Sequence, residues 1–322
     1  MTAALPRVRR LAHSDFTRDL DANTEELGSL LELAADVKRA PELYRTALTG
    51  KALALLFEKP SLRTRVTFEL AIQQLGGFAI LNEGRIGVRE PLKDVARNLD
   101  RWVSGIVART YRQQTVDDLA LWSAVPVMNA LSDLWHPCQA LADMQTIREH
   151  FGDMRGLKLA FVGDGNNVAG SLLVNATRLG MDFSIATPAG YALPEWIVEL
   201  AQSRVETARV EISDDATEAV RGAQIVYTDV WTSMGEEHEA ASRLAAFAGY
   251  QVNDDLMSHA SPEAIFMHCL PAHRGEEVTD GVMESARSVV FDQAENRLHA
   301  QKALLLMLLG QDGLLGRDSR GQ

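Results

Sequence analysis

The stretch Leu55-Leu-Phe-Glu-Lys-Pro-Ser-Leu-Arg-Thr-Arg-Val-Thr-Phe-Glu-Leu70 joins a predicted strand to a predicted helix. The apolar run 52–57 is typical of a buried strand, and Ser61 can cap a helix that follows it. The first helical turn then carries Arg63 and Thr64 beside N–H groups at the positive end of the helix dipole. This arrangement predicts a cradle for a phosphate or carboxylate group. A capped helix with solvated arginines is the ordinary alternative.

Composition and charge narrow the class of protein. The 322 residues are enough for two domains of about 150 residues each. A net charge of −12 disfavours a nucleic-acid partner, and no apolar run reaches the length that a membrane helix needs. The two cysteines, Cys138 and Cys269, are too few for a disulfide framework and indicate a reducing compartment. We therefore expect a cytoplasmic protein.

The order of predicted elements alternates strand and helix along the chain, which indicates parallel sheets with helices on both faces. We expect two three-layer α/β domains joined by linking helices, with the C-terminal helix packing back on the first domain. The first domain is expected over residues 1–145 together with about 293–322, and the second over 146–292. A last strand is predicted at 289–291.

Polar residues follow several predicted strands of the first half. Arg109 ends the strand predicted at 105–108, and it is expected to share one sheet edge with Arg63 and Arg65. His136 and Gln139 follow the next strand, where a core histidine and a surface glutamine are the ordinary interpretations. Their convergence at one edge predicts an anion pocket.

The second half offers an amine pocket in the same manner. Asn167, Asp229 and Cys269 follow predicted strands, and Ser233 lies in a loop just beyond Asp229. The turn at 163–168 follows a strand but lacks the third glycine of a dinucleotide fingerprint and the acidic residue after the next strand. An NAD-dependent oxidoreductase therefore remains a minority interpretation.

Six segments in order along nearly the whole chain resemble the aspartate/ornithine carbamoyltransferase family, and the last four resemble its ornithine branch. These segments are Phe57-Glu-Lys-Pro-Ser-Leu-Arg-Thr-Arg65, His136-Pro-Cys-Gln139, Asp164-Gly-Asn-Asn167, Asp229-Val-Trp-Thr-Ser-Met-Gly235, His268-Cys-Leu-Pro271 and Glu295-Asn-Arg297.

The resemblance implies transfer of the carbamoyl group from carbamoyl phosphate to the δ-amine of L-ornithine, giving L-citrulline and phosphate. It implies that the residues contacting carbamoyl phosphate are Ser61, Leu62, Arg63, Thr64, Arg109, His136, Gln139, Cys269, Leu270 and Arg297. The catalytic roles would fall on Arg63, Arg109, His136 and Cys269. The ornithine contacts would be Asn167, Asp229, Ser233 and Met234. No metal or organic cofactor is implied.

One position departs from the family pattern. The usual Ser-Thr-Arg-Thr is Ser-Leu-Arg-Thr here, so Leu62 offers only its backbone N–H. The loss of one hydrogen bond to a charged ligand costs roughly 1.5–3 kcal/mol when nothing replaces it. Arg85 or Arg89 could replace it, because in this family the corresponding loop enters the site from a neighbouring subunit. The resemblance accordingly implies a homotrimer or a multiple of trimers.

Three alternatives remain open at this point. A carbamoyltransferase for acetylornithine or putrescine would keep the anion pocket and change the segment around Ser233. A dicarboxylate acceptor would be repelled by Asp229. A catalytically silent paralogue would need only the fold. The matched charged residues are all retained in this sequence, which argues against that alternative.

Overall fold

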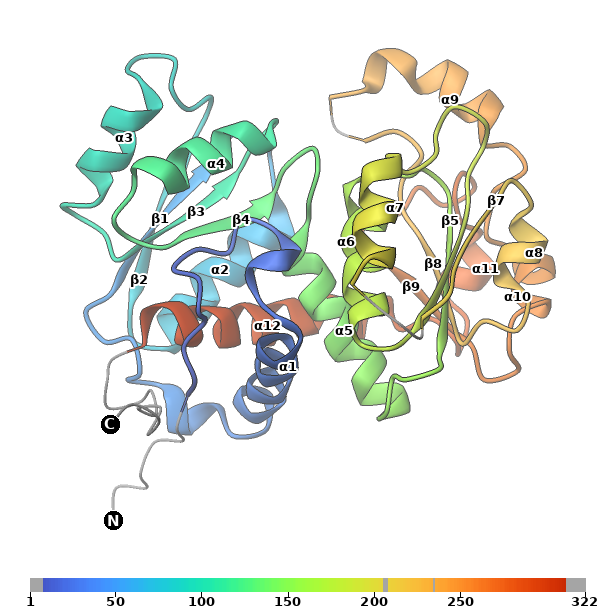
Figure 1. Cartoon of the computed structure of the whole chain (residues 1–322), viewed down its shortest axis with the longest axis horizontal. Helices are drawn as coiled ribbons and strands as arrows, with labels where there is room; N and C mark the ends of the chain where they lie inside the picture. The colour runs from blue at the N-terminus through green and yellow to red at the C-terminus, as the bar shows by residue number, and fades with distance from the viewer. Residues whose placement is uncertain (1–7, 205–207, 234, 311–322) are drawn as a thin grey trace. The chain divides into compact units, whose positions relative to one another are not determined.

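The computed structural model describes residues 8–204, 208–233 and 235–310 (Figure 1). The chain divides into two compact units, the first formed by residues 1–145 and 295–322 and the second by 146–294. Met234, one of the expected ornithine contacts, lies outside the described residues.

The first unit contains a parallel sheet of four strands in the order β2-β1-β3-β4. Its elements up to the linking helix are α1 (Thr24–Arg39), β1 (Ala52–Phe57), α2 (Leu62–Gln74), β2 (Phe78–Glu83), α3 (Leu92–Leu99), β3 (Gly105–Arg109), α4 (Gln113–Trp122) and β4 (Val127–Leu131). The apolar sequence of β1 is explained by burial on both faces, since all six of its residues are buried.

Alternate residues of β1 pack on opposite layers. Ala54 and Leu56 belong to a core cluster with Ala96 of α3 and Val116 of α4. The other layer holds α2 and α12 (Val290–Leu309), and Figure 1 shows these two helices across the sheet from α3 and α4. Together with the unit boundaries, this confirms that the C-terminal helix packs on the first unit.

The second unit contains a parallel sheet of five strands in the order β7-β6-β5-β8-β9. Its elements are β5 (Lys158–Val162), α6 (Asn167–Arg178), β6 (Asp182–Ala186), α7 (Glu195–Gln202), β7 (Val210–Ser213), α8 (Ala216–Val220), β8 (Ile225–Thr228), α9 (Ala240–Ala246), α10 (Asp254–Ser258), β9 (Ile265–His268) and α11 (Asp280–Met283). Helices α5 (Pro137–Phe151) and α12 each begin in one unit and end in the other. The prediction of two parallel α/β sheets is confirmed.

The strand predicted at 289–291 is wrong. Ser288 makes only an isolated bridge to Phe266, and the helix α12 already begins at Val290. The short apolar run that suggested a strand is instead the first turn of a largely buried helix, and such runs do not distinguish the two by periodicity.

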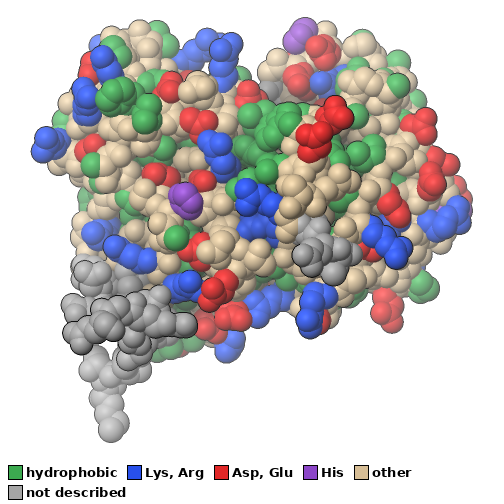
Figure 2. All heavy atoms as spheres, in the orientation of Figure 1, with side chains coloured by type: hydrophobic (Ala, Val, Ile, Leu, Met, Phe, Trp, Pro, Cys, Tyr) green, Lys and Arg blue, Asp and Glu red, His purple; other side chains and the backbone are tan. Residues whose placement is uncertain are grey.

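The surface view in Figure 2 shows Lys and Arg side chains interspersed with Asp and Glu over the visible face. Among the described residues, no helix combines the length and apolarity needed to cross a membrane.

Candidate active site

The first unit carries a group of expected site residues where β1 passes into α2. Ser61 adopts an extended backbone and its hydroxyl accepts the N–H of Thr64 at 3.2 Å, which confirms it as the N-cap of α2. The N–H groups of a first helical turn point beyond the end of the helix and carry partial positive charge. The hydroxyl of Thr64 is buried and accepts a hydrogen bond from Nη2 of Arg297 at 2.7 Å.

Arg109 reaches the same edge from the end of β3. Phe57 and Arg109 are register partners in the sheet, and the N–H of Glu58 donates to the carbonyl of Arg109 at 2.8 Å. Arg109 is 6% exposed, so its charge lies in a weakly solvated environment. A cation in such surroundings acts more strongly on a bound anion than one in bulk water.

His136 is surrounded by cations of this unit. It is 5% exposed, and burial first, then the charges of Arg297, Arg109 and Lys59, hold its pKa well below the ordinary value. The imidazole is therefore uncharged at neutral pH and can act as a hydrogen-bonding group rather than as another cation. Lys59 was not among the expected site residues, although its place directly before Pro60 in the cradle was a usable signal.

The loop that carries His136 is held by buried polar groups. The amide of Asn129 donates to Gln113 Oε1 at 3.0 Å and to Ser132 Oγ at 3.2 Å, and Ser132 Oγ accepts the N–H of Trp135 at 3.2 Å. Gln139 is 1% exposed rather than a surface residue, because α5 is buried over its first turns. Its amide donates to Asp143 Oδ1 at 2.8 Å.

Other residues of the cradle segment point to different partners. Arg65 pairs with Glu69 at 3.1 Å in the i,i+4 geometry of a helix surface, and Nη1 lies 3.8 Å from Glu83. Glu83 is the last residue of β2 and the register partner of Phe57, so Arg65 lies at the expected sheet edge with its guanidinium beside carboxylates. Leu62 is 74% exposed at the first position of α2.

Arg85 lies close to the ring of Tyr111 in its own chain. The guanidinium carbon is 5.6 Å from the ring centroid, and Nζ of Lys59 is 4.8 Å from the same centroid. The carboxylate of Glu58 accepts the N–H of Ile86 and the N–H of Tyr111, each at 3.0 Å. Glu58 thus fixes the loop of Arg85 against the edge that carries Arg109.

The second unit carries its own group of expected site residues, at the ends of β5, β8 and β9. Asp229 is buried and accepts hydrogen bonds from Asn166 Nδ2 at 2.9 Å, Val230 N at 2.8 Å and Cys269 Sγ at 3.0 Å. Asn166 also caps α6 through its amide oxygen, which accepts the N–H of Val168. The structure therefore brings Asp229 and Cys269 together, with Asn167 as the first residue of α6.

A buried histidine fixes the turn after β9. Nδ1 of His268 accepts the N–H of Leu270 at 2.9 Å, so the ring proton belongs on Nε2, which donates to Glu277 Oε1 at 3.2 Å. His268 and Glu277 are both fully buried. Leu270 has a φ of +60°, a region that side chains other than glycine rarely adopt and that often marks functional turns.

The donor atoms of Asp229, His268 and Cys269 all lie within 4.8 Å of one another. Asp229 and Cys269 already bond each other, and both ring nitrogens of His268 bond other groups. The chemistry of the cluster thus fits an internal hydrogen-bond network.

The glycine-containing turn after β5 does not leave its backbone open to a dinucleotide. A Cβ on Gly165 would stand 2.3 Å from Leu193 N, and the N–H of Gly165 donates to the carbonyl of Tyr191 at 2.8 Å. The absence of a side chain at Gly165 lets residues 191–193 of the same chain pack closely against its backbone.

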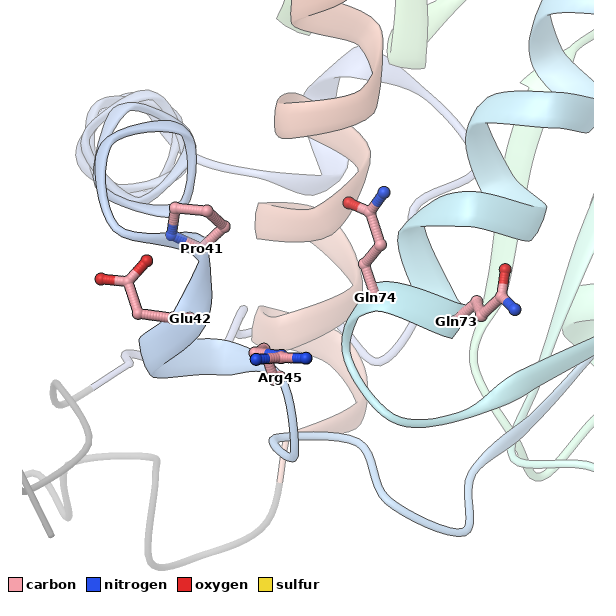
Figure 3. A pocket seen from close by; sticks show the side chains of 5 residues that line it. All are labelled: Pro41, Glu42, Arg45, Gln73 and Gln74. Carbon is pink, nitrogen blue, oxygen red and sulfur yellow. The ribbon is translucent and has the colours of Figure 1, made fainter.

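A hollow of about 580 Å³ in the first unit lies away from the cradle (Figure 3). Pro41, Glu42 and Arg45 line it from one side, and Gln73 and Gln74 come from the C-terminal end of α2. The cradle is at the opposite end of that 13-residue helix, about 18 Å along its axis.

Comparisons with known proteins agree with this geometry. Residues 14–149 match a family model described as the carbamoyl-P binding domain of aspartate/ornithine carbamoyltransferase, and residues 155–308 match the Asp/Orn binding domain. The ornithine carbamoyltransferase of Acidothermus cellulolyticus is 49% identical over 303 residues, which cover 92% of this chain and 97% of that protein.

Solved structures give the same result. The ornithine carbamoyltransferase of Pyrococcus furiosus is 48% identical, with a TM-score of 0.90 over 94% of this chain and 99% of that chain. An acetylornithine transcarbamylase complexed with acetylcitrulline is 33% identical, with a TM-score of 0.84 over 92% of this chain and 98% of that chain. On these matches the chain belongs to the aspartate/ornithine carbamoyltransferase family.

Proposed function

We propose that the protein transfers the carbamoyl group of carbamoyl phosphate to the δ-amine of L-ornithine, giving L-citrulline and phosphate. The observation that carries the proposal is the uncharged His136 held among Lys59, Arg109 and Arg297. Such a cluster suits a substrate with a dianionic phosphate and a neutral carbonyl oxygen, because it provides both cations and an uncharged polar group.

In this proposal the first unit binds the phosphate through the N-terminus of α2. The groups assigned to carbamoyl phosphate are Ser61, Leu62 through its N–H, Arg63, Thr64, Arg109, His136, Gln139, Cys269, Leu270 and Arg297. Thr64 and Arg297 are held together by their hydrogen bond, so both are oriented before the ligand arrives. Preorientation of this kind lowers the entropy cost of binding.

The reaction is a direct attack of the amine on the carbonyl carbon. As the nitrogen–carbon bond forms, negative charge grows on the carbonyl oxygen, where Arg109 and His136 stabilise it. The bond from carbon to the phosphate oxygen then breaks, and phosphate leaves with the proton that the amine loses. Phosphate is the leaving group, so the reaction requires no metal or organic cofactor.

The second unit binds ornithine in its neutral δ-amine form. Asp229 holds the α-ammonium, and Asn167 and Ser233 orient the amino-acid head, with Met234 also assigned to this substrate. Cys269 donates a hydrogen bond to Asp229 and is assigned a place beside the δ-amine in this proposal. The curated relatives named ornithine carbamoyltransferase are 46–50% identical to this chain, whereas the acetylornithine enzyme is 33% identical, which favours ornithine as the acceptor.

An acceptor panel tests the proposal directly. The purified protein is given carbamoyl phosphate with ornithine, acetylornithine, putrescine, lysine or aspartate, and the carbamoylated product is identified by mass spectrometry. Citrulline from ornithine alone is the expected result. Carbamoylation of a different amine would contradict the assignment of Asp229 and Ser233 and leave the anion pocket standing, whereas no product with any acceptor would indicate a silent paralogue.

We further propose a homotrimer, or a multiple of trimers, that works in the cytoplasm. Support comes from an exposed apolar surface on α2 and β2, which a second copy would cover. It comprises Val66, Leu70, Phe78 and Ile80. Light scattering should give three times the chain mass or a multiple of it, and a monomer would contradict the proposal.

In this assembly Arg85 would reach the site of a neighbouring subunit. Trimers that mix Arg85→Met chains with Arg109→Met chains test this. If Arg85 acts across subunits, a site that takes Arg109 from one variant chain and Arg85 from the other is intact. Mixing the two variants should then restore part of the activity. If Arg85 acts within its own chain, every site carries a defect and no activity returns.

A further inference from the structure

Arg243 of α9 is a buried arginine with no role in the function proposed above. Its guanidinium is 7% exposed, and Nη1 donates to Asp164 Oδ2 at 2.7 Å and to the carbonyl of Trp231 at 3.0 Å. Asp164 belongs to the turn after β5 and Trp231 to the segment after β8. One side chain therefore joins the two segments that carry Asn167 and Ser233.

The other nitrogens of Arg243 reach beyond Ser233. Nη2 lies 2.9 Å from Glu236 Oε2, and Nε donates to Glu239 Oε2 at 3.2 Å. The same oxygen of Glu236 accepts the N–H of Ser233 at 3.3 Å, while the N–H of Glu236 donates to the carbonyl of Ser233 at 3.0 Å. A continuous chain of contacts thus runs from Asp164 through Arg243 and Glu236 to the backbone of Ser233.

Aromatic rings fix the plane of the guanidinium. Its central carbon is 5.0 Å from the ring centroid of Tyr191, which lies 4.8 Å from that of Phe247. Trp231 is stacked on Phe247 with centroids 5.8 Å apart. A planar, multidirectional donor is needed to contact a ring and three acidic groups at once, and arginine provides it where lysine does not.

The same cluster also reaches Asp229. Asn166 follows Asp164 by two positions and donates to Asp229 Oδ2 at 2.9 Å. The turn after β5 is thereby linked to Asp229 on one side and, through Arg243, to Ser233 on the other. Displacement of this turn would change both expected ornithine contacts together.

We propose that Arg243 and Glu236 are positioning residues, which hold the backbone of Ser233 in register with the turn at Asp164 and so set the affinity for the amino-acid substrate. The assignment of that substrate rests on the proposed function. Neither residue is assigned a contact with carbamoyl phosphate, so the effect should be specific to one substrate.

The test compares steady-state kinetics of Glu236→Gln, Arg243→Met and Arg243→Lys with the wild type. Glu236 is 39% exposed, so Glu236→Gln should fold normally and raise KM for ornithine about 3- to 10-fold. Arg243→Met should raise it more than 10-fold, with Arg243→Lys between the wild type and the Met variant. KM for carbamoyl phosphate should stay within about twofold throughout.

Two matched controls come from the same unit. Arg155→Met removes an exposed arginine that pairs with Asp153, and Glu218→Gln changes a carboxylate that accepts a hydrogen bond from Ser213. Both should leave both KM values unchanged. Equal changes in the two KM values for Glu236→Gln, or no change in either, would overturn the proposal.

A measurement without substrate separates this proposal from the proposed function. Amide hydrogen exchange of the peptide that contains Ser233 should accelerate about 10-fold in Glu236→Gln and stay at the wild-type rate in Glu218→Gln. Unchanged exchange would overturn the positioning role even if citrulline forms. Faster exchange in Glu236→Gln, together with a wild type that fails to carbamoylate ornithine, would overturn the proposed function alone.

Discussion

Nη2 of Arg297 donates a hydrogen bond to the hydroxyl of Thr64 at 2.7 Å, although the two residues are 233 positions apart in the sequence. This bond ties α12 to the first turn of α2 within one unit. The expected phosphate cradle is therefore made of residues from both ends of the chain.

Arg297→Met should weaken carbamoyl phosphate selectively. It removes a buried cation beside Thr64 and His136, and the loss of a charge-assisted hydrogen bond should lower kcat/KM for carbamoyl phosphate about 30- to 100-fold, or roughly 2–3 kcal/mol. KM for ornithine should change less than threefold. Steady-state kinetics with each substrate varied in turn checks this, and an equal loss for both substrates would contradict it.

His136 should remain uncharged across the working pH range. Burial and the neighbouring cations lower its folded-state pKa, so below about pH 6.5 the unfolded chain binds this proton and the folded chain does not. Stability should therefore fall as pH drops through 6.5, and His136→Gln should reduce that loss. The imidazole NMR signals assigned by comparison with His136→Gln should not shift between pH 6 and 8, and a titration in that interval would contradict the prediction.

Cys269 should act through its bond to Asp229 rather than as a covalent nucleophile. Cys269→Ser retains a donor at the same place and should keep kcat/KM for ornithine within about 10-fold of the wild type. Cys269→Ala removes the donor, and its kcat/KM for ornithine should be about 10-fold lower than that of Cys269→Ser. Mass spectrometry of the enzyme quenched during turnover should show no carbamoylated Cys269, and such an adduct would contradict direct attack by the amine.

Asp164 should give the folded protein an unusual pH dependence. Burial raises its pKa to about 6, against the opposing effect of Arg243. Between about pH 4 and 6 the folded state then binds this proton more tightly than the unfolded state, so the contribution of Asp164 to stability increases as pH falls through 6. Relative to Asp164→Asn, the wild-type free energy of unfolding should rise by at most about 1.4 kcal/mol per pH unit.

Urea unfolding at pH 7, 6 and 5 measures this difference. Asp153→Asn serves as the control, because the hydrogen bonds from Arg155 lower the pKa of Asp153 to about 2. The difference in free energy of unfolding between Asp153→Asn and the wild type should stay constant from pH 7 to pH 5. A constant difference for Asp164→Asn as well would contradict the raised pKa.

Leu62→Thr should strengthen carbamoyl phosphate binding. Leu62 is 74% exposed at the first position of α2, so a hydroxyl there would meet the ligand without disturbing the core. KM for carbamoyl phosphate should fall about 3- to 10-fold, with KM for ornithine unchanged. The Leu62→Val variant is the control, since it shortens the side chain without adding a hydroxyl, and an equal effect of both would contradict the argument.

Local signals in the sequence were sufficient for much of the fold. The strand at 52–57 and the cap at Ser61 were predicted correctly, because a continuous apolar run and a serine before a helix act within a few residues. The run at 289–291 was wrong because its burial depends on the rest of α12. Pattern alone does not report such tertiary burial.

The candidate site likewise combines features that local sequence patterns predict with features that depend on tertiary packing. The strand pattern placed Arg109 and Asp229 at strand ends and His136 after a strand, whereas the resemblance implied their roles, which stay predictions. Sequence analysis missed Lys59 near His136 and the bond between Arg243 and Asp164, which lie 79 positions apart. Partners at such separations follow from the packing of elements and leave no local pattern.

The discontinuous first unit has a consequence for biosynthesis. Its sheet is complete in sequence by Leu131, yet residues 295–310 of the same unit are synthesised only after the whole second unit. Domains generally fold from the N-terminus as they emerge from the ribosome. A nascent chain therefore has the strands of both sheets before it has Arg297, and the expected phosphate cradle is completed only after both sheets have been synthesised.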